Sequence, residues 1–544
     1  MVKQSENIEP DAAEQHLDAI VIGAGFGGLY ALYHLRKSGL SVKAFDGAGG
    51  VGGTWWWNRY PGASVDIPSA PFYAFTFSEE LAREWDWTER QPGQPEVLAY
   101  LEYVADKFDL RRDIQLKTWI SDARFDEKTG RWTLQTDSGQ RVSAQFLICA
   151  AGTLSATNLP DIPGIADFGG ECYHTGRWPH EPVDFAGKRV GVIGTGSSAV
   201  QAIPSIARSA AHLTVFQRTP QYCIPARNGP IDRNYLKQVQ AEWKKHSDFM
   251  HTSLTGMPYP SVERSALDDT PEQRQEVYEA LWVDGGFRVL FGGYNDLMTN
   301  KAANATLGEF VRGKIREQVR DPATANKLMP DYMLGTKRLI LDEGYFETYN
   351  RDNVSLVDLR DDPIERIIGN AVVTASGEHT LDMLVLATGY DAITGTLLRL
   401  NPRGRDGVDL ATTWRESFTT YLGMMIPGFP NFFLIHGPES PSVLHNMPLA
   451  GELQSDWIGD CIEHLRMNKF NTIEPAPGME IEWRQSTDDA ARETLFREGD
   501  SWYTGANIEG KHRQFVVHMG GKEYFEILDD VAHKDYRGFV LAQT

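Results

Sequence analysis

The stretch LDAIVIGAGFGGLYALYHLRKSGLSVKAFD, residues 17–46, decides the fold class of this chain. A β-forming run over residues 17–22 meets a glycine cluster, an apolar helical pattern follows, and a second β-forming run covers residues 42–45. This order of elements within about 30 residues is typical of a βαβ unit. The stretch KRVGVIGTGSSAVQAIPSIARSAAHLTVFQR, residues 188–218, repeats it. The sequence therefore predicts an α/β fold with two Rossmann-like dinucleotide-binding domains.

The loop of the first unit has the spacing G-x-G-x-x-G, with Gly23, Gly25 and Gly28. The first glycine permits a tight turn, the second lets a diphosphate approach the backbone, and the third lets helix and strand pack closely. The amides at the start of the helix then face the phosphates. Asp46 ends the second strand, where a carboxylate binds ribose hydroxyls. A lone glycine motif is weak evidence, but strand, loop, helix and acid together are specific.

The second loop carries the variant G-x-G-x-x-A, with Gly194, Gly196 and Ala199. Its second strand ends in Gln217 and Arg218, where the first unit has an acid. An acid would repel a 2′-phosphate, whereas an arginine pairs with one in bidentate fashion. A solvated cation at a strand end is the alternative, but the loop context favours a phosphate contact and hence NADPH.

Two dinucleotide sites in one chain indicate that a bound flavin, FAD, receives hydride from NADPH. Disulfide reductases, other flavin reductases and flavin monooxygenases all fit this description. The first class needs a redox-active cysteine pair. The four cysteines, Cys149, Cys172, Cys223 and Cys461, lie far apart and form no C-x-x-C pair, which excludes that class and suits a reducing compartment.

Composition limits the class of protein further. The 544 residues carry a formal net charge of −21, so we expect several domains and no nucleic-acid or membrane partner. The N-terminus has no apolar signal segment and no apolar run approaches the ~20 residues that span a bilayer. Scattered histidines without a H-x-x-x-H pair predict no metal. A cytoplasmic protein is predicted.

The distribution of helical spacing, charged residues and strand-forming residues along the chain predicts five segments. Residues 225–330 have helical spacing, many charges and few strand formers, and β-forming runs return after residue 335. The expected division is a first part of the FAD-binding domain over 1–150, a first part of the NADP-binding domain over 151–224, a mostly helical insertion over 225–330, a second NADP part over 331–388 and a second FAD part over 389–544.

Four further stretches resemble one family. These are GGTWWWNRYPGASVD (52–66), FGGECYHTGRWPH (168–180), LDMLVLATGYD (381–391) and SWYTGANIEGK (501–511). Together they are similar to the signatures of the type I Baeyer–Villiger monooxygenases, flavoproteins that insert oxygen beside a ketone carbonyl. The second stretch matches the family fingerprint through Phe168, Gly170, His174, Trp178 and Pro179. The likeness runs from about residue 17 to the end of the sequence.

The resemblance implies roles for particular residues. In GTKRLIL (335–341), Arg338 would be the active-site arginine beside the flavin, Asp66 would orient it, and Lys337 would join Arg218 at the 2′-phosphate. FAD would be contacted, besides the glycine loop, by Asp46, Thr54, Trp55, Trp56, Trp57, Asp66, Tyr73, Ile120 and Met447. NADP would be contacted by Gly194, Thr195, Gly196, Ser197, Ser198, Ala199, Gln201, Arg218, Thr219, Lys337, Arg338 and Trp502.

The reaction of this family explains why an arginine at position 338 would be needed. Reduced flavin adds oxygen at C4a, and the peroxide anion attacks the ketone. Arginine stays protonated at any working pH and presents several donors, so Arg338 suits an anion in a dry site. On composition alone, Lys337 and Arg338 would be an exposed basic pair. His174 resembles a general base, but the family places it away from the reacting atoms, as a linker residue.

Substrate choice is the least defined part. The pocket would be lined by Ser442, Val443, Leu444 and Tyr503, which favours a small hydrophobic ketone, cyclic or aryl-aliphatic, reacting with O2 to an ester or lactone, with sulfoxidation as a side activity. No obligate protein partner is implied. Glu439, in GPESPSVLHNM (437–447), stands where we expect a small residue. An N- or S-oxygenating flavin monooxygenase and a non-catalytic NADPH/FAD-binding sensor are the alternatives.

Overall fold

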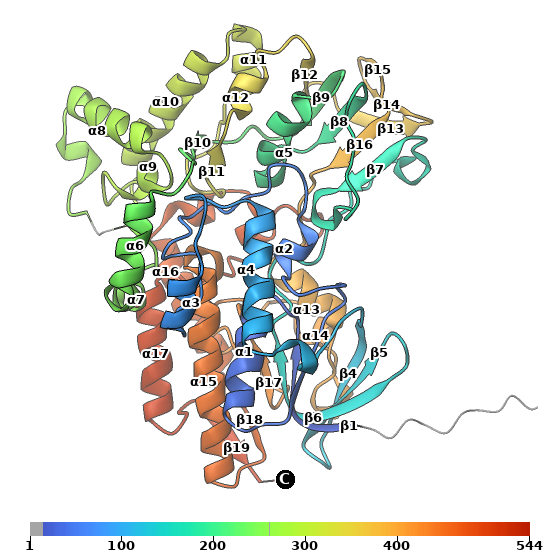
Figure 1. Ribbon diagram of the computed structural model, residues 1–544, viewed down its shortest axis with the longest axis vertical. Coiled ribbons are helices and arrows are strands. Elements are labelled where there is room, and N and C mark those ends of the chain that lie inside the picture. The colour runs from blue at the N-terminus through green and yellow to red at the C-terminus, as the bar shows by residue number, and fades with distance from the viewer. Residues whose placement is uncertain (1–14, 260–261, 544) are drawn as a thin grey trace, which may run out of the picture.

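Two β-rich halves are stacked in the computed structural model, which describes residues 15–259 and 262–543 (Figure 1). The lower half is built on a seven-stranded sheet with the order β3-β2-β1-β6-β5-β4, in which β17 also pairs with β6. Its strands are β1 (Gln15–Ile22), β2 (Val42–Phe45), β3 (Ile114–Gln115), β4 (Ile120–Asp126), β5 (Arg131–Thr136), β6 (Arg141–Cys149) and β17 (Phe432–Leu434). Strands β3, β2, β1, β6 and β17 run parallel, as the first βαβ unit requires.

The upper half contains a five-stranded parallel sheet with the order β12-β9-β8-β16-β7. Its strands are β7 (Glu171–His174), β8 (Arg189–Ile193), β9 (His212–Gln217), β12 (Val354–Asp358) and β16 (Met383–Leu386). A three-stranded antiparallel sheet, β13 (Ile364–Ile368), β14 (Ala371–Thr374) and β15 (Gly377–Thr380), lies beside it. The predicted α/β class with two Rossmann-like units is confirmed.

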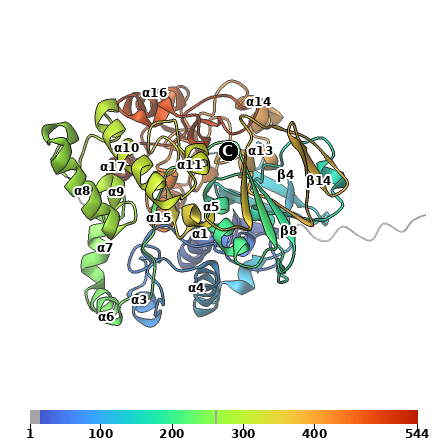
Figure 2. The same cartoon turned by 90° about the horizontal axis from the view of Figure 1, so that it is seen from above.

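A mostly helical region lies along one side of the molecule (Figure 2). Its helices are α6 (Arg233–Ala241), α7 (Trp243–Thr252), α8 (Pro271–Asp284), α9 (Arg288–Phe291), α10 (Lys301–Gln318) and α11 (Pro322–Lys327). Helices α6 and α7 contact α3 (Glu79–Glu84). Helix α8 begins with a capping box between Thr270 and Gln273. The short parallel pair β10 (Cys223–Pro225) and β11 (Ile340–Asp342) encloses this region in the sequence.

The remaining α-helices pack around the two sheets or against one another. They are α1 (Phe26–Lys37), α2 (Thr54–Trp57), α3 (Glu79–Glu84), α4 (Gln94–Lys107), α5 (Ser197–Ala207), α12 (Tyr345–Thr348), α13 (Thr394–Leu400), α14 (Leu410–Thr413), α15 (Met447–Met467), α16 (Met479–Arg492) and α17 (Gly521–His533). Strands β18 (Thr472–Pro475) and β19 (Phe539–Ala542) pair antiparallel. Helices α1 and α15 lie side by side, so both ends of the chain build the lower half (Figure 1).

The ends of the parallel strands place the site. In β1 the side chains of Ala19, Ile20 and Val21 are fully buried, which is expected of a parallel sheet covered on both faces. The carboxyl ends of β1, β6 and β17 meet where Ile22, Cys149 and Leu434 align. Ligands of such sheets bind outside these ends.

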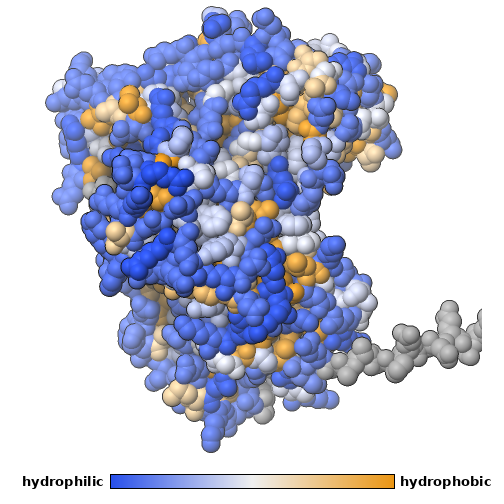
Figure 3. Space-filling view, in the orientation of Figure 1, coloured by the Kyte–Doolittle hydropathy of each residue, from blue (hydrophilic) through white to orange (hydrophobic). Residues whose placement is uncertain are grey.

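Hydrophilic residues cover most of the face seen in Figure 3, and the outline is hollowed between the two β-rich halves. Over residues 15–259 and 262–543, no helix combines the length and the apolar composition that a membrane span needs. The segment boundaries at residues 150, 224, 330 and 388 stay a prediction.

Candidate active site

The first glycine loop packs so closely against neighbouring backbone that Gly23 and Gly28 have no room for a side chain. Gly23 has a φ of +108°, and a Cβ on it would lie 2.4 Å from the carbonyl oxygen of Ala150. A Cβ on Gly28 would lie 2.0 Å from the carbonyl oxygen of Gly23. Helix α1 starts directly after Gly25 without a side-chain cap or an acidic residue in its first turn. Its free amides and the bare backbone fit the diphosphate of a dinucleotide.

Replacing Gly28 with alanine should therefore displace helix α1 from strand β1. We expect loss of bound flavin, measured as flavin absorbance per protein, together with a lower melting temperature. Gly313→Ala is the matched control, because Gly313 lies inside α10 with nothing within 4 Å of an added Cβ. That variant should gain about 0.5–1 kcal/mol of stability. Full flavin content in Gly28→Ala would contradict the tight-packing argument.

Asp46 lies at the end of β2 and faces this loop. Its carboxylate accepts hydrogen bonds from the amides of Ala24 at 2.7 Å and Ala48 at 2.8 Å. Burial raises the pKa of Asp46, although the two amides and the nearby Arg177 lower it. The carboxylate has lone pairs left over for a ribose hydroxyl.

The tryptophan motif forms the short helix α2 beside the loop. Trp55 is buried and donates its indole N–H to the Tyr73 hydroxyl at 3.0 Å, so it packs rather than reacts. The guanidinium carbon of Arg177 lies 4.1 Å from the centre of the Trp57 ring, and the Trp56 ring contacts the His180 ring at an interplanar angle of 46°. Thr54 is exposed at the first position of α2.

Arg338 and Asp66 form the charged centre of the candidate site. The Nε and Nη2 groups of Arg338 donate to Oδ2 of Asp66 at 2.9 and 2.5 Å. Arg338 lies just before β11 and Asp66 lies in the loop after α2, so the pair joins the two halves of the molecule. Burial disfavours the charged guanidinium, but Asp66 and Tyr503 raise the pKa of Arg338 above its ordinary value. The arginine is therefore a permanent cation.

Three further groups surround this cation. The Nη1 group of Arg338 donates to the carbonyl oxygen of Val443 at 3.3 Å, and Tyr503 is close enough to the guanidinium for each group to shift the pKa of the other. The guanidinium carbon also lies 5.4 Å from the centre of the Phe287 ring. Tyr259 is close enough to Asp66 and Arg338 to interact electrostatically with both. A cation rimmed by aromatic side chains is suited to hold developing negative charge in a dry site.

The second glycine loop repeats the geometry of the first. Gly194 has a φ of +108°, and a Cβ on it would lie 2.4 Å from the carbonyl oxygen of Ala387. Helix α5 follows Gly196 without a side-chain cap, so the amides of Ser197 and Ser198 are free for a phosphate. Ala199 is fully buried. This loop fits a second diphosphate.

Side chains around this loop connect it to its neighbours. Thr195 donates its hydroxyl to the carbonyl oxygen of Thr219 at 2.7 Å. Gln201 accepts from the Tyr60 hydroxyl at 2.8 Å and donates to the carbonyl oxygen of Ser64 at 3.1 Å. Helix α5 is thereby attached to the loop that carries Asp66 from the lower half.

The structure brings the two predicted phosphate-binding cations together. Arg218 is exposed directly after β9, and it is close enough to Lys337 to affect its charge. Burial lowers the pKa of Lys337, and the neighbouring Arg218 lowers it further, while Asp500 raises it. The ammonium group also donates to the carbonyl oxygen of Asp500. Two neighbouring cations are chemically suited to a dianion such as a 2′-phosphate, and this role stays a prediction.

The fingerprint stretch has a structural place at the edge of the upper sheet. Phe168 packs beneath Gly170, and β7 follows. His174 is buried at the end of β7, where its Nδ1 accepts from the amide of Gly176 at 3.0 Å. Burial lowers the pKa of His174, so the imidazole is neutral. Trp178 is buried and donates its backbone N–H to the carbonyl oxygen of Trp57, and Pro179 follows it. This stretch links the upper sheet to the tryptophan motif.

The other predicted residues form no hydrogen bond or ion pair with Arg338 among the residues that the structure describes. Ile120 begins β4, Met447 begins α15, and the Trp502 ring contacts the Tyr503 ring in a tilted arrangement with 4.4 Å between ring centres. Ser442 is fully buried, and its hydroxyl has no hydrogen-bond partner among the described residues. Leu444 is half-buried.

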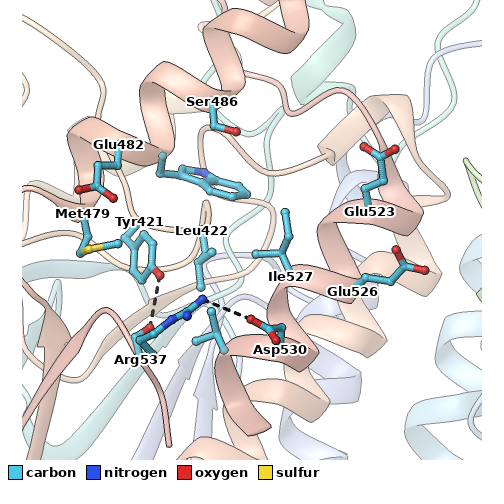
Figure 4. A pocket seen from close by; sticks show the side chains of 12 residues that line it. Tyr421, Leu422, Met479, Glu482, Ser486, Glu523, Glu526, Ile527, Asp530 and Arg537 are labelled. Carbon is cyan, nitrogen blue, oxygen red and sulfur yellow. Dashed lines mark hydrogen bonds and ion pairs between the residues drawn. The ribbon is translucent and has the colours of Figure 1, made fainter. Parts of the chain in front are cut away.

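A separate hollow lies between α16 and α17 (Figure 4). It is lined by Tyr421, Leu422, Met479, Glu482, Trp483, Ser486, Glu523, Glu526, Ile527, Asp530, Val531 and Arg537. None of these is a predicted site residue. The hollow therefore does not belong to the Arg338 centre.

Comparison with known proteins now supplies the family. A family profile described as "Pyridine nucleotide-disulphide oxidoreductase" matches residues 20–251. A "Baeyer-Villiger monooxygenase" from Pseudooceanicola batsensis is 42% identical over 99% of this chain and 99% of that protein. The chain belongs to the Baeyer–Villiger monooxygenase family. The resemblance inferred from the sequence motifs is confirmed.

Two other monooxygenases are similar over almost the whole chain. The solved structure "Oxidized steroid monooxygenase bound to NADP" superposes with a TM-score of 0.93 at 46% identity, over 97% of this chain and 100% of that one. "Phenazine N-monooxygenase PhzNO1" from Lysobacter antibioticus is 42% identical over 98% of both chains. The four cysteines of this Baeyer–Villiger family member are free thiols, unlike the disulphide in the profile's description.

The sequence motifs of the Baeyer–Villiger family did not reveal every residue near the centre. Phe287 and Tyr259 come from the helical region, which carries no motif. Arg177 lies inside the fingerprint stretch, and its position between His174 and Trp178 was the signal that could have found it. Phe287 and Tyr259 can be found only from three-dimensional contacts, because no sequence motif marks them.

Glu452 provides a test of the buried charges in this family member. It lies on α15 and accepts hydrogen bonds from the amide and the hydroxyl of Thr76, both at 2.7 Å. Burial raises its pKa to about 8. The folded carboxyl thus stays protonated where the unfolded one ionises, and stability present below the ordinary pKa is lost as pH rises through 8. In the wild-type protein, Glu452 should lower the free energy of unfolding by up to about 1.4 kcal/mol per pH unit between pH 5 and 8. Urea unfolding of Glu452→Gln should show a pH dependence that is smaller by this amount. Identical pH slopes would contradict this assignment.

Proposed function

We propose that this protein is an FAD-containing, NADPH- and O2-dependent Baeyer–Villiger monooxygenase that converts hydrophobic ketones to esters or lactones. The observation that carries the proposal is the Arg338–Asp66 pair at 2.5 Å, with Tyr503 and the Val443 carbonyl on the same guanidinium. The two glycine loops with their uncapped helices support binding of both dinucleotides. The Arg218 and Lys337 cations support NADPH over NADH.

The residues of the chain have distinct tasks in this proposal. When bound, reduced flavin supplies the activation of O2. Arg338 holds the negative charge that develops on oxygen, because a guanidinium offers several donors and remains protonated. Asp66 fixes the guanidinium by accepting from Nε and Nη2, which leaves Nη1 directed toward Val443. Phe287 and Tyr503 exclude water from the same region.

The substrate we propose is a small hydrophobic ketone, cyclic or aryl-aliphatic. Val443, Leu444 and Phe287 offer apolar surface near the cation. A hydrophobic pocket distinguishes one methylene by only about 1–3 kcal/mol, so a range of ketones is expected. We further propose the division of the chain into an FAD part and a NADP part at the boundaries given above, and a cytoplasmic location.

A product assay tests the proposal. The purified flavoprotein receives NADPH, air and a panel of cyclic and aryl-aliphatic ketones, with a phenazine and a sulfide as comparison substrates. Mass spectrometry for the gain of one oxygen should reveal ester or lactone in step with NADPH oxidation. Oxygenation of only the phenazine or the sulfide would favour N- or S-oxygenation. No flavin reduction by NADPH would favour a silent binding protein.

A further inference from the structure

The segment between β17 and α15, residues 436–444, has an unusual backbone. His436, Glu439 and Ser442 have φ values of +57°, +67° and +42°, a region that favours glycine. Such conformations persist only where the surroundings fix them, and they cluster at functional sites. The contacts of Glu439 provide the fixing groups.

The Glu439 side chain is buried in the interior. It is 1% exposed, and its Oε2 accepts from the amide and the hydroxyl of Thr420 at 3.0 and 3.1 Å. Its Oε1 lies 3.4 Å from Nε2 of Gln514 and 3.9 Å from Nη1 of Arg484 on α16. One carboxyl group therefore joins three segments that are far apart in the sequence.

The backbone around Glu439 is held by the same neighbours. Trp483, which lines the hollow in Figure 4, donates its indole N–H to the carbonyl oxygen of Glu439 at 3.2 Å. The amide of Glu439 donates to the carbonyl oxygen of Val516 at 2.8 Å, and the amide of His518 donates to the carbonyl oxygen of Ser440 at 2.9 Å. Residues 439–440 are thereby attached to residues 514–518.

Both attached segments reach Arg338. Val443, four residues after Glu439, accepts from Nη1 of Arg338 at 3.3 Å. On the other segment, the amide of Val516 donates to the carbonyl oxygen of Tyr503, and the Tyr503 side chain is close enough to Arg338 to interact with it electrostatically. Apart from Asp66, these are the polar groups that the described residues place on the guanidinium.

We propose that Glu439 is a positioning residue for ketone oxygenation, whose carboxyl group clamps together the two segments that contact Arg338, residues 437–444 and 501–516. The proposal rests on the proposed function of Arg338. Glu439 itself does not touch the reacting groups. Burial raises its pKa to about 8, so near neutral pH the clamp works largely through hydrogen bonds.

Three variants of the flavin-loaded protein test the clamp. Glu439→Gly removes the carboxyl group and relieves the positive φ. Glu439→Gln keeps an oxygen acceptor for the amide of Thr420. Glu452→Gln is the matched control, because Glu452 is equally buried and accepts the same pair of groups from Thr76. The readouts are ketone KM and kcat, the share of NADPH oxidation that ends as hydrogen peroxide, and hydrogen–deuterium exchange of peptides covering 436–446 and 501–516.

Glu439→Gly should raise ketone KM about tenfold, increase peroxide release and speed exchange in both peptides, because the carboxyl group loses three hydrogen bonds, two from Thr420 and one from Gln514. Glu439→Gln should stay within about threefold of wild type, and Glu452→Gln should leave KM and both peptides unchanged. Unchanged KM and exchange in Glu439→Gly would overturn the proposal.

A second variant and an activity-independent readout keep the clamp testable if Glu439→Gly does not bind flavin or no ketone is oxygenated. If Glu439→Gly is recovered without flavin, Thr420→Val serves as the second variant. It replaces the Thr420 hydroxyl, a partner of the Glu439 carboxyl group, by a methyl group of similar size. The proposal then requires faster exchange in both peptides. Unchanged exchange there would overturn it. If the wild-type protein oxygenates no ketone, the proposed function fails, while the exchange measurements still decide whether Glu439 joins the two segments.

Discussion

Replacing Arg338 with alanine should abolish ketone oxygenation and leave the reduction of flavin by NADPH intact. Removal of one preorganised donor typically costs about 10²–10³ in kcat, or about 2.7–4 kcal/mol. Arg338 also neutralises Asp66, so the variant leaves a carboxylate beside the developing negative charge. NADPH should still be oxidised, with hydrogen peroxide as the product. Stopped-flow flavin bleaching and a product assay measure the two steps separately.

Arg338→Lys refines this expectation. A lysine retains the charge but cannot present the two donors that Nε and Nη2 give to Asp66. We expect activity between those of wild type and the alanine variant. Ester formation at the wild-type rate in Arg338→Ala would show that another group stabilises the charge.

Removal of the two cations at the end of β9 should change the nucleotide preference. A hydrogen bond to a charged group contributes about 1.5–3 kcal/mol, so Arg218→Ala and Lys337→Ala should each raise KM for NADPH about tenfold to a hundredfold. KM for NADH should change little, because NADH lacks the 2′-phosphate. Steady-state oxidation of the two nucleotides provides the comparison.

The control for this pair lies on the same sheet. Arg189 begins β8 and pairs with Asp382 at 2.7 Å, at the opposite end of the strand from the glycine loop. Arg189→Ala should therefore leave both KM values unchanged. Equal increases of KM for NADPH and NADH in Arg218→Ala would show that Arg218 acts on a part shared by the two nucleotides.

Local patterns predicted the elements well. The strand predicted over residues 42–45 has these bounds as β2, and the strand predicted over residues 17–22 lies within β1. Glycine spacing also predicted two loops where a Cβ would clash with backbone. Such features depend on a few neighbouring residues, which is why the sequence alone contains them.

Contacts between distant segments were beyond this reach. Asp66 and Arg338 are far apart in the chain, and their pairing was expected only from the family resemblance. The approach of Phe287 to Arg338 depends on how the helical region folds back, for which no motif exists. The inward turn of Glu439 depends on Thr420, Arg484 and Gln514, three positions that no local pattern connects.

The construction of the lower sheet from both ends of the chain has a consequence for biosynthesis. Strand β6 ends at Cys149, but its parallel neighbour β17 begins only at Phe432. At ~5–20 residues per second, a ribosome needs roughly 15–60 s to make the intervening stretch. During that interval the edge of β6 from Leu147 to Cys149 has no β17 beside it, whereas β7, β8, β9, β12 and β16 are all synthesised within it. The nascent upper half should therefore mature first, and the lower half should need chaperone protection until β17 and α15 emerge.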